Sequence, residues 1–281
     1  MKYLNNKIIL GSAQFSGNYG ISNVKKKQIN FKKINQLLLQ NKVNKFDTAP
    51  FYKDASKHLK KILTFKSDIY TKIKYKSNHM NPNLLVDSLI NHKNELNIKN
   101  FEGVYIHDFE INNENNFKYL NNVCNLIKES RLTNNFGFSI YQVNTLNFLL
   151  KNIKIDILQL PINIFNRSFI SYLPKIKKNF QIKIFARSVF LQGVLIKPPL
   201  KIYRKDKFLF DSYKIWLENK KLRSINACLG FINQNKWIDH IIIGVDNFDQ
   251  LKEILTLDIS NFRVPKKLFS NQKEIIDPRC W

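Results

Sequence analysis

The stretch Val43-Asn44-Lys45-Phe46-Asp47-Thr48-Ala49-Pro50-Phe51-Tyr52 runs from a short strand-like segment into an acid and, five residues later, a phenol. Two later strand-like segments, residues 68–72 and 103–107, end in a lysine and a histidine. In a parallel β/α barrel the carboxyl ends of the strands gather at one face, and that face holds the active site. The pattern therefore predicts that four polar side chains meet in space: Asp47, Tyr52, Lys72 and His107.

Strand-like segments alternate with amphipathic stretches along the whole chain, which is typical of βαβ units and a parallel sheet. Eight segments have strand character: residues 7–10, 44–47, 69–72, 103–107, 135–138, 155–159, 183–186 and 240–243. Helices are expected over residues 31–41, 55–63, 82–96, 115–127, 143–150, 169–180 (with an irregularity at Pro174), 208–237 as two helices, and 248–255. We therefore predict an α/β fold, an eight-stranded (β/α)8 TIM barrel, in which residues 1–281 form one domain.

Length and composition are compatible with one large soluble barrel. The chain has 281 residues, no apolar run approaching the roughly 20 residues of a membrane helix, and no signal-peptide pattern near its start. Its three cysteines, at positions 124, 228 and 280, are widely spaced and odd in number, which favours a reducing, cytoplasmic location over a disulfide framework. The histidines show no metal-ligand spacing, so no metal site is predicted, although the cluster of His107, Asp108 and Glu110 could be mistaken for one.

The formal net charge is +25, which raises the possibility of a polyanion partner. The alternative explanation is codon bias, because Lys, Asn, Ile and Phe are all abundant and all have A/T-rich codons. The lysines are scattered over the chain and form no arginine-rich stripe. We therefore expect no specific nucleic-acid partner and no membrane partner.

Residues 46–52 also carry a resemblance, because Phe-Asp-Thr-Ala-Pro-Phe-Tyr resembles the D-T-A-x-x-Y segment of the aldo-keto reductases. Further motifs follow in the order of that family and span the chain from Gly11 to its end. They are Thr71-Lys72, Tyr105-Ile106-His107, Gly137-Phe138-Ser139, Gln159 with Asn163, Ser188 through Gly193, and Gly244 through Gln250. A single motif of this kind would be weak, whereas seven in order are a strong indication.

The chemistry of the four residues agrees with the roles that the resemblance implies. Tyr52 is expected to be the general acid for a carbonyl oxygen, and a nearby Lys72 ammonium would lower its pKa from the ordinary value near 10. Asp47 would pair with Lys72 and hold it in place. His107 would hydrogen-bond the substrate carbonyl and orient it. Each of these residues taken alone has an ordinary structural explanation. Only their combination at the strand ends indicates an active site.

The resemblance implies a nicotinamide cofactor across the barrel mouth, NADPH as the commoner choice in the family with NADH possible. The residues expected to bind it are Gly11, Ser12, Ala13, Ser139, Gln159, Asn163, Arg187, Ser188, Phe190, Gly193, Gly244, Val245, Asp246, Gln250 and Glu253. Three departures from the family pattern stand out. Ile140 replaces an asparagine, Arg187 stands where many members have an aromatic ring, and neither Gly244 nor Gln250 supplies a cation for a 2′-phosphate.

The expected substrate is a small carbonyl compound or sugar. Phe15, Phe51 and Trp281 could contact it, with core packing as the alternative for the two phenylalanines and Arg279 as an alternative contact from the tail. The Asp277-Pro278-Arg279-Cys280-Trp281 ending resembles a bacterial branch of the family associated with sugar or surface-polysaccharide metabolism. Two other functions stay open from sequence: a cofactor-binding regulator on the same fold, and a basic nucleic-acid-binding protein. The sequence does not predict an oligomeric state.

Overall fold

Eight parallel strands close into a barrel in the computed structural model, which describes residues 4–17, 29–75, 81–109, 115–259 and 262–281. Each strand pairs with its neighbours in sequence order, and β8 pairs with β1 to complete the circle. The strands are β1 Ile8–Gly11, β2 Lys45–Asp47, β3 Asp68–Lys74, β4 Phe101–His107, β5 Thr133–Ser139, β6 Ile157–Pro161, β7 Lys183–Arg187 and β8 His240–Gly244. The predicted fold class is therefore confirmed.

The barrel interior is packed with side chains from alternate positions of the strands. Ile9, Tyr70, Tyr105, Ile157 and Phe185 form a separate buried cluster, in which the Phe185 ring lies 5.1 Å from the Tyr70 ring and 6.0 Å from the Tyr105 ring, centroid to centroid. Such a plug of bulky residues makes the barrel a core and not a pore. Any site must therefore lie at an end of the barrel.

Two glycines make this packing possible. A Cβ at Gly103 would lie 2.6 Å from the Tyr70 ring, and one at Gly137 would lie 1.7 Å from the backbone oxygen of Ile157. A larger residue at Gly137 would require a strand to move, and one at Gly103 would displace the Tyr70 and Ile157 side chains. The aromatic plug and the close approach of β5 to β6 thus depend on the absence of side chains at these positions.

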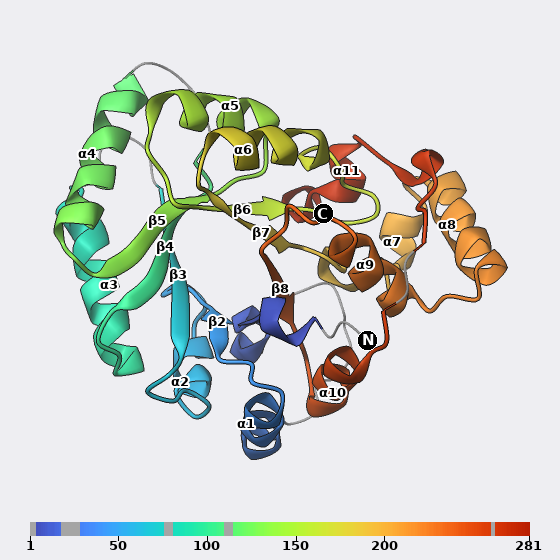
Figure 1. The fold of residues 1–281 in the computed structure, drawn as a ribbon, viewed down its shortest axis with the longest axis horizontal. Helices are drawn as coiled ribbons and strands as arrows, with labels where there is room; N and C mark the ends of the chain where they lie inside the picture. Colours follow the sequence, from blue (N-terminus) through green and yellow to red (C-terminus); the bar gives the residue numbers. More distant parts are fainter. Residues whose placement is uncertain (1–3, 18–28, 76–80, 110–114, 260–261) are drawn as a thin grey trace.

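Helices surround the strands, with α8 farthest from the barrel (Figure 1). The α-helices are α1 Phe31–Gln40, α2 Ala55–Leu59, α3 Asn83–Leu96, α4 Asn115–Glu129, α5 Val143–Asn152, α6 Leu173–Asn179, α7 Leu200–Tyr203, α8 Lys207–Asn219, α9 Ser224–Asn233, α10 Phe248–Thr256 and α11 Lys273–Ile276. Short 3-10 turns are η1 Asn5–Lys7, η2 Ala13–Ser16, η3 Ile170–Tyr172, η4 Leu191–Gly193, η5 Lys266–Leu268 and η6 Pro278–Cys280. None of the described helices is long and apolar enough to cross a membrane.

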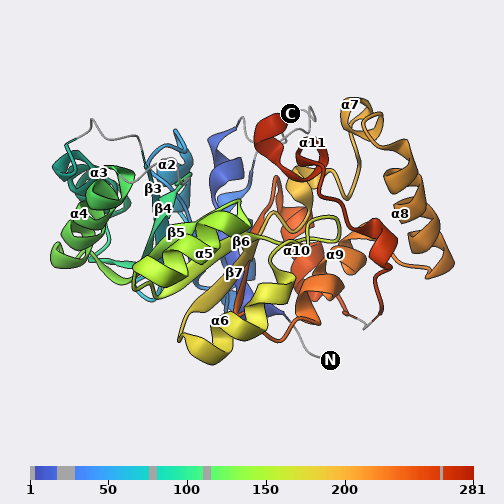
Figure 2. The ribbon, with the colours of Figure 1, turned by 90° about the horizontal axis from the view of Figure 1, so that it is seen from above.

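The helix predictions differ from the structure mainly at irregular ends. The expected helix over residues 169–180 is a 3-10 turn followed by α6, and Pro174 lies in the first turn of α6. Its missing N–H costs nothing there, so the proline starts the helix and does not disturb it. The segment between β7 and α8 contains η4 and α7, and α7 and the C-terminal segment lie at the same edge of the barrel (Figure 2).

Candidate active site

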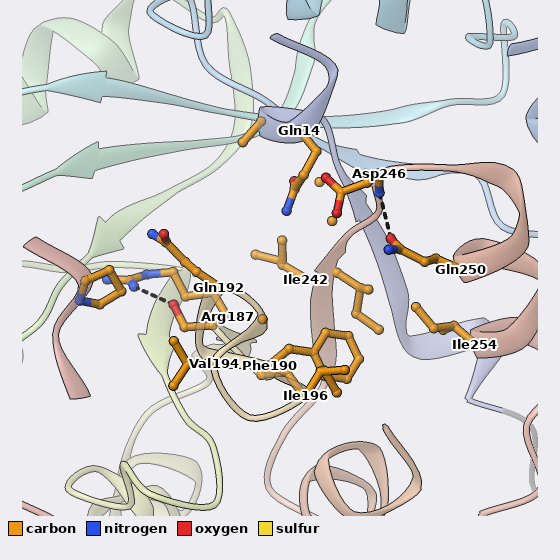
Figure 3. A pocket seen from close by; sticks show the side chains of 18 of the residues that line it. Gln14, Arg187, Phe190, Gln192, Val194, Ile196, Ile242, Asp246, Gln250 and Ile254 are labelled. Carbon is orange, nitrogen blue, oxygen red and sulfur yellow. Dashed lines mark hydrogen bonds between the residues drawn. The ribbon is translucent and has the colours of Figure 1, made fainter. Parts of the chain in front are cut away.

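A cavity of about 1040 Å³ opens at the carboxyl ends of the strands. Its inner part is lined by Asp47, Tyr52, Lys72, His107, Tyr141, Gln159 and Arg187, and its outer part by residues of η4, α7, α9 and α10. Figure 3 shows Arg187 and Gln192 on one side of the cavity, Asp246 and Gln250 on another, and Phe190 and Ile196 between them. The four side chains expected to converge thus share one cavity.

A buried ion pair forms the floor of the inner part. The Lys72 ammonium, on β3, contacts the Asp47 carboxylate at the end of β2, and the two side chains are only 3% and 5% exposed. Lys72 also donates to the backbone oxygen of Thr48 at 3.2 Å. The second Asp47 oxygen accepts from Gln159 Nε2 at 2.9 Å, so both charges are held by several partners in a fixed geometry.

Tyr52 lies above this pair, with the Lys72 ammonium 5.3 Å from the centroid of its ring. The structure shifts the pKa of Tyr52 in the direction opposite to the sequence prediction. Burial and the nearby Asp47 carboxylate raise the pKa of the phenol, and Arg187 lowers it only in part. The main reason is burial, which penalises the charged phenolate, and the negative charge of Asp47 adds to it.

His107 ends β4 and lies between aromatic rings on two sides. Its ring is 6.2 Å from that of Phe51, stacked, and 6.1 Å from that of Tyr141, centroid to centroid. Burial, together with the positive charges of Arg187 and Lys72, lowers the pKa of His107 to about 2. The imidazole is therefore neutral near pH 7, so one ring nitrogen can donate a hydrogen bond without carrying a charge.

A hydrogen-bond chain joins the ends of β5, β6 and β7. Ser139 Oγ donates to Gln159 Oε1 at 2.9 Å, and Arg187 Nε donates to Ser139 Oγ at 3.3 Å. Because Gln159 also donates to Asp47, the chain connects the ion pair to Arg187 across the barrel mouth. Gln159 and Arg187 line the cavity, whereas Ser139 is fully buried behind them.

The segment after β7 has an unusual backbone. Four residues have positive φ angles: Ser188 at 56°, Leu191 at 48°, Gln192 at 52° and Gly193 at 92°. Left-handed conformations are costly for residues other than glycine and are concentrated at ligand-binding segments, where successive N–H groups can form an anion-binding concavity. Asn163 supports this segment, because its amide donates to the Ser188 oxygen at 3.0 Å while its own oxygen accepts from two backbone N–H groups of the loop after β6.

The outer part of the cavity is more exposed. Gln250 accepts a hydrogen bond from the Asp246 backbone N–H at 2.8 Å (Figure 3). Asn247 caps α10, because its side chain accepts from the Gln250 N–H. Arg223, just before α9, bonds the Glu253 carboxylate at 2.6 Å, with side-chain exposures of 64% and 39%. A cation therefore does reach this part of the cavity, from the start of α9, where the sequence had suggested no binding residue.

The structure separates the predicted binding residues into two groups. Lining the cavity are Gly11, Ala13, Gln159, Arg187, Ser188, Phe190, Gly193, Gly244, Asp246, Gln250 and Glu253. Outside the lining lie Ser12, Ser139, Asn163 and Val245, all buried, and the three expected substrate contacts Phe15, Phe51 and Trp281. Phe15 packs in the core against Phe31, and the Trp281 indole donates to the Glu274 backbone oxygen at 3.1 Å.

Tyr141 and Gln14 line the cavity and were missed from sequence. Tyr141 follows the end of β5 by two residues, so an aromatic residue just past a strand end was an available signal. Gln14 covers Gly244, where a Cβ would lie 1.9 Å from its amide oxygen, a long-range contact that no local pattern reports. In the part of the chain that the structure describes, no group of three His, Cys, Asp or Glu residues could hold a metal, and Glu110 of the suspected cluster lies outside the described residues.

The residues present fit a nicotinamide dinucleotide. The cavity runs continuously from the buried polar network to α10, glycines line it at Gly11, Gly193 and Gly244, and the left-handed segment after β7 lies along it. Its volume is at the upper end of the range for small-molecule sites, as a long ligand requires.

Comparison with known proteins gives a consistent result. The model of the aldo/keto reductase family matches residues 7–277. Among solved structures, an aldo-keto reductase from Bacillus halodurans in its holo form is 14% identical, with 95% of each chain covered and a TM-score of 0.72. A glycerol dehydrogenase from Gluconobacter oxydans is 15% identical over 90% of this chain and 88% of its own, with a TM-score of 0.66. No curated protein sequence matches significantly.

Proposed function

Because this chain belongs to the aldo/keto reductase family, we propose that it is an NAD(P)H-dependent oxidoreductase that acts on the carbonyl of an aldehyde, ketone or sugar. The observation that carries the proposal is the convergence of Asp47, Tyr52, Lys72 and His107 on one cavity. These four residues come from three different strands and one loop, and the cavity that they share has a volume of about 1040 Å³. A protein that only bound the cofactor would not require a buried ion pair beneath a phenol.

When bound, NAD(P)H would supply the hydride for the carbonyl carbon. The residues of this chain would handle the oxygen. Tyr52 would donate its phenolic proton to the carbonyl oxygen as negative charge develops there. His107, neutral at pH 7, would donate a hydrogen bond to the same oxygen and fix its position.

The raised pKa of Tyr52 suits the direction of reduction. A phenol that is reluctant to ionise keeps its proton until a stronger base, the developing alkoxide, is in contact with it. Lys72 and Asp47 would then act mainly by holding charge and geometry beneath the phenol. In the reverse direction, alcohol oxidation, the same pKa would require higher pH to generate the phenolate.

The cofactor would be held along the whole cavity. Gln159 would face its carboxamide end, the left-handed segment of residues 188–193 its pyrophosphate, and the Gly244–Gln250 segment its adenosine. Ser139 and Asn163 would support this arrangement from behind by fixing Gln159 and Ser188. We favour NADPH, with NADH as the alternative, because Arg223 supplies one cation at the adenosine end.

We further propose one barrel domain over residues 1–281, a cytoplasmic location and a small-molecule carbonyl substrate. A polyol or sugar is in keeping with the glycerol dehydrogenase among the structural relatives. The three free cysteines fit a reducing compartment.

The test is Tyr52→Phe, which removes the proton donor and keeps the ring. We expect a loss of at least about a hundredfold in kcat, as is usual for a general acid, with nearly unchanged cofactor affinity. Turnover is followed by NADPH absorbance with a panel of aldehydes and sugars, and affinity by fluorescence titration with NADPH and NADH. Tyr172→Phe, the same change outside the cavity lining, is the control. A Tyr52→Phe enzyme with wild-type turnover would remove the phenol from the mechanism.

A further inference from the structure

Arg187 is a buried cation whose hydrogen-bond partners are all neutral. Its side chain leaves the end of β7, the residue is 9% exposed, and its guanidinium donates to Ser139 Oγ at 3.3 Å, Ser188 Oγ at 3.2 Å and the Ile140 backbone oxygen at 3.2 Å. Among the described residues, no carboxylate accepts a hydrogen bond from it or forms an ion pair with it. Burying a charge costs free energy unless the charge is paired, so an unpaired buried cation that lines a cavity indicates that an anion binds there.

A second guanidinium lies on the same aromatic ring. The central guanidinium carbon of Arg187 is 3.9 Å from the centroid of the Tyr141 ring, and that of Arg279, from the C-terminal tail, is 3.7 Å from it. Asp277 accepts from Arg279 Nη2 at 2.7 Å and from its Nε at 3.0 Å, so this carboxylate is engaged by the tail arginine. The wall of the cavity beside Tyr141 therefore carries two guanidinium groups, held in place by ring contacts, and the Asp277 carboxylate, whose pKa both arginines lower. Its net charge is a single positive charge, because Asp277 is ion-paired with Arg279 and not with Arg187.

This wall lies in the same cavity as the proposed catalytic residues. Arg187 and Tyr141 line the same cavity as Tyr52 and His107, and the rings of Tyr141 and His107 are 6.1 Å apart. The positive charge of Arg187 is also close enough to contribute to the lowered pKa of His107, after burial. An anionic group bound at Arg187 would leave the rest of a small molecule directed at the phenol and imidazole.

We propose that Arg187 is the anion-recognition residue of the substrate pocket, and that the substrate is an aldehyde, ketone or sugar that carries a carboxylate or phosphate group. The inference rests on the proposed function, since it names the substrate class of the same site. A guanidinium is suited to this role because its planar fork matches the oxygens of a carboxylate or phosphate in a bidentate manner and stays charged at every physiological pH. Tyr141 and the tail residue Arg279 would hold the fork in its orientation.

The first test measures binding and needs no turnover. Benzoate and its neutral counterpart benzamide are titrated into the protein by calorimetry, with and without NADPH. We expect the wild type to bind benzoate about 10- to 100-fold more tightly than benzamide, the range for a charge-assisted hydrogen bond. Arg187→Gln should abolish the difference, and Arg187→Lys, which keeps the charge without the fork, should retain part of it.

The second test measures the preference in catalysis with two matched pairs of substrates. One pair is 4-carboxybenzaldehyde and methyl 4-formylbenzoate, and the other is glyceraldehyde 3-phosphate and glyceraldehyde. The wild type should prefer the anionic member of at least one pair in kcat/KM, and the pair that shows it distinguishes a carboxylate from a phosphate site. Lys197→Gln removes the same charge from an exposed position of the cavity lining and should leave the ratio within each pair unchanged.

The outcomes separate this inference from the proposed function. Turnover of neutral aldehydes with no anion preference in binding or in kcat/KM would overturn the anion site and leave the reductase intact. An Arg187→Gln protein that keeps the preference would also overturn it, as would one that loses cofactor affinity while its anion preference persists. Absence of turnover on every aldehyde would count against the reductase, while the benzoate titration would still decide the role of Arg187.

Discussion

The two ends of the cavity are built in different ways. At the inner end the Lys72–Asp47 pair is 3% and 5% exposed and tied into a chain of hydrogen bonds through Gln159 and Ser139. At the outer end the pair of Arg223 and Glu253 is 64% and 39% exposed and lies between two helices. Charges in low-dielectric surroundings interact strongly, whereas exposed ones are screened by water and salt. The polar groups of the inner end are thus held rigidly, whereas the proposed contact of the outer end with the cofactor should be easier to change.

The largest effect is expected from breaking the inner pair. Lys72→Met leaves the Asp47 carboxylate buried with its amide partner but without its cation, and the loss of one member of a buried pair costs about 3–5 kcal/mol in the free energy of unfolding. The matched control is Lys45→Met on the neighbouring strand, because Lys45 bonds Asp68 at 3.3 Å with exposures of 25% and 38%. That exposed pair should contribute about 0–1 kcal/mol.

Urea denaturation of the two variants gives the comparison. Equal losses of stability in both would mean that the inner network is no more tightly coupled than the surface of the protein, and the contrast between the two ends of the cavity would disappear. A loss of stability in Lys72→Met alone would support the contrast between the two ends of the cavity.

The inner end was also the part that the sequence predicted best. Strand ends are marked by local apolar patterns, and in a parallel barrel the register brings all strand ends to one face, so the meeting of Asp47, Lys72 and His107 follows from topology. The direction in which these residues and their surroundings shift the pKa of Tyr52 did not follow from topology. The pKa of Tyr52 rises because the phenol is buried and because the Asp47 carboxylate lies nearby, and neither the burial nor such distances can be derived from sequence spacing.

The outer end was predicted less well because it is built from contacts between distant helices. Arg223 precedes α9 and meets Glu253 on α10, thirty residues later, through side chains that no strand register fixes. The tail shows the same limit: Pro278 lines the cavity and Arg279 covers Tyr141, whereas Trp281 bonds the tail itself. Sequence indicated that these segments matter and could not say which side chains face inward.

A smaller effect is expected from the pH dependence of the inner end. The pKa of His107 is lowered to about 2 in the folded protein, against an ordinary value of 6.5. As pH falls below 6.5 the unfolded chain takes up a proton at this position and the folded protein does not, so stability that is present above pH 6.5 is lost on acidification.

His107→Gln removes this contribution, so wild type and variant should converge in stability as pH falls. The gap between their free energies of unfolding should narrow by about 1.6 kcal/mol in total between pH 6.5 and pH 5, because the unfolded histidine is half protonated at the first pH and almost fully protonated at the second. Three other histidines with lowered pKa values, His58, His92 and His240, are present in both proteins and cancel in the difference. A gap that stays constant from pH 7.5 to pH 5 would mean that His107 titrates as an exposed residue does.

The smallest effect is expected at the outer end, from Arg223→Ala. Because the arginine is exposed, its loss should change the free energy of unfolding by no more than about 1 kcal/mol. As a cation in the cavity wall, Arg223 should raise the affinity for NADPH, with its additional phosphate, relative to that for NADH by at most about fivefold. Salt should reduce that preference further.

Fluorescence titrations with both cofactors at low and at 0.5 M salt measure the ratio of the two affinities. Glu253→Gln, which frees the arginine from its partner, should shift the ratio toward NADPH. A change of a hundredfold, or one insensitive to salt, would show that Arg223 is desolvated on cofactor binding, and the outer end would then be as firmly built as the inner one.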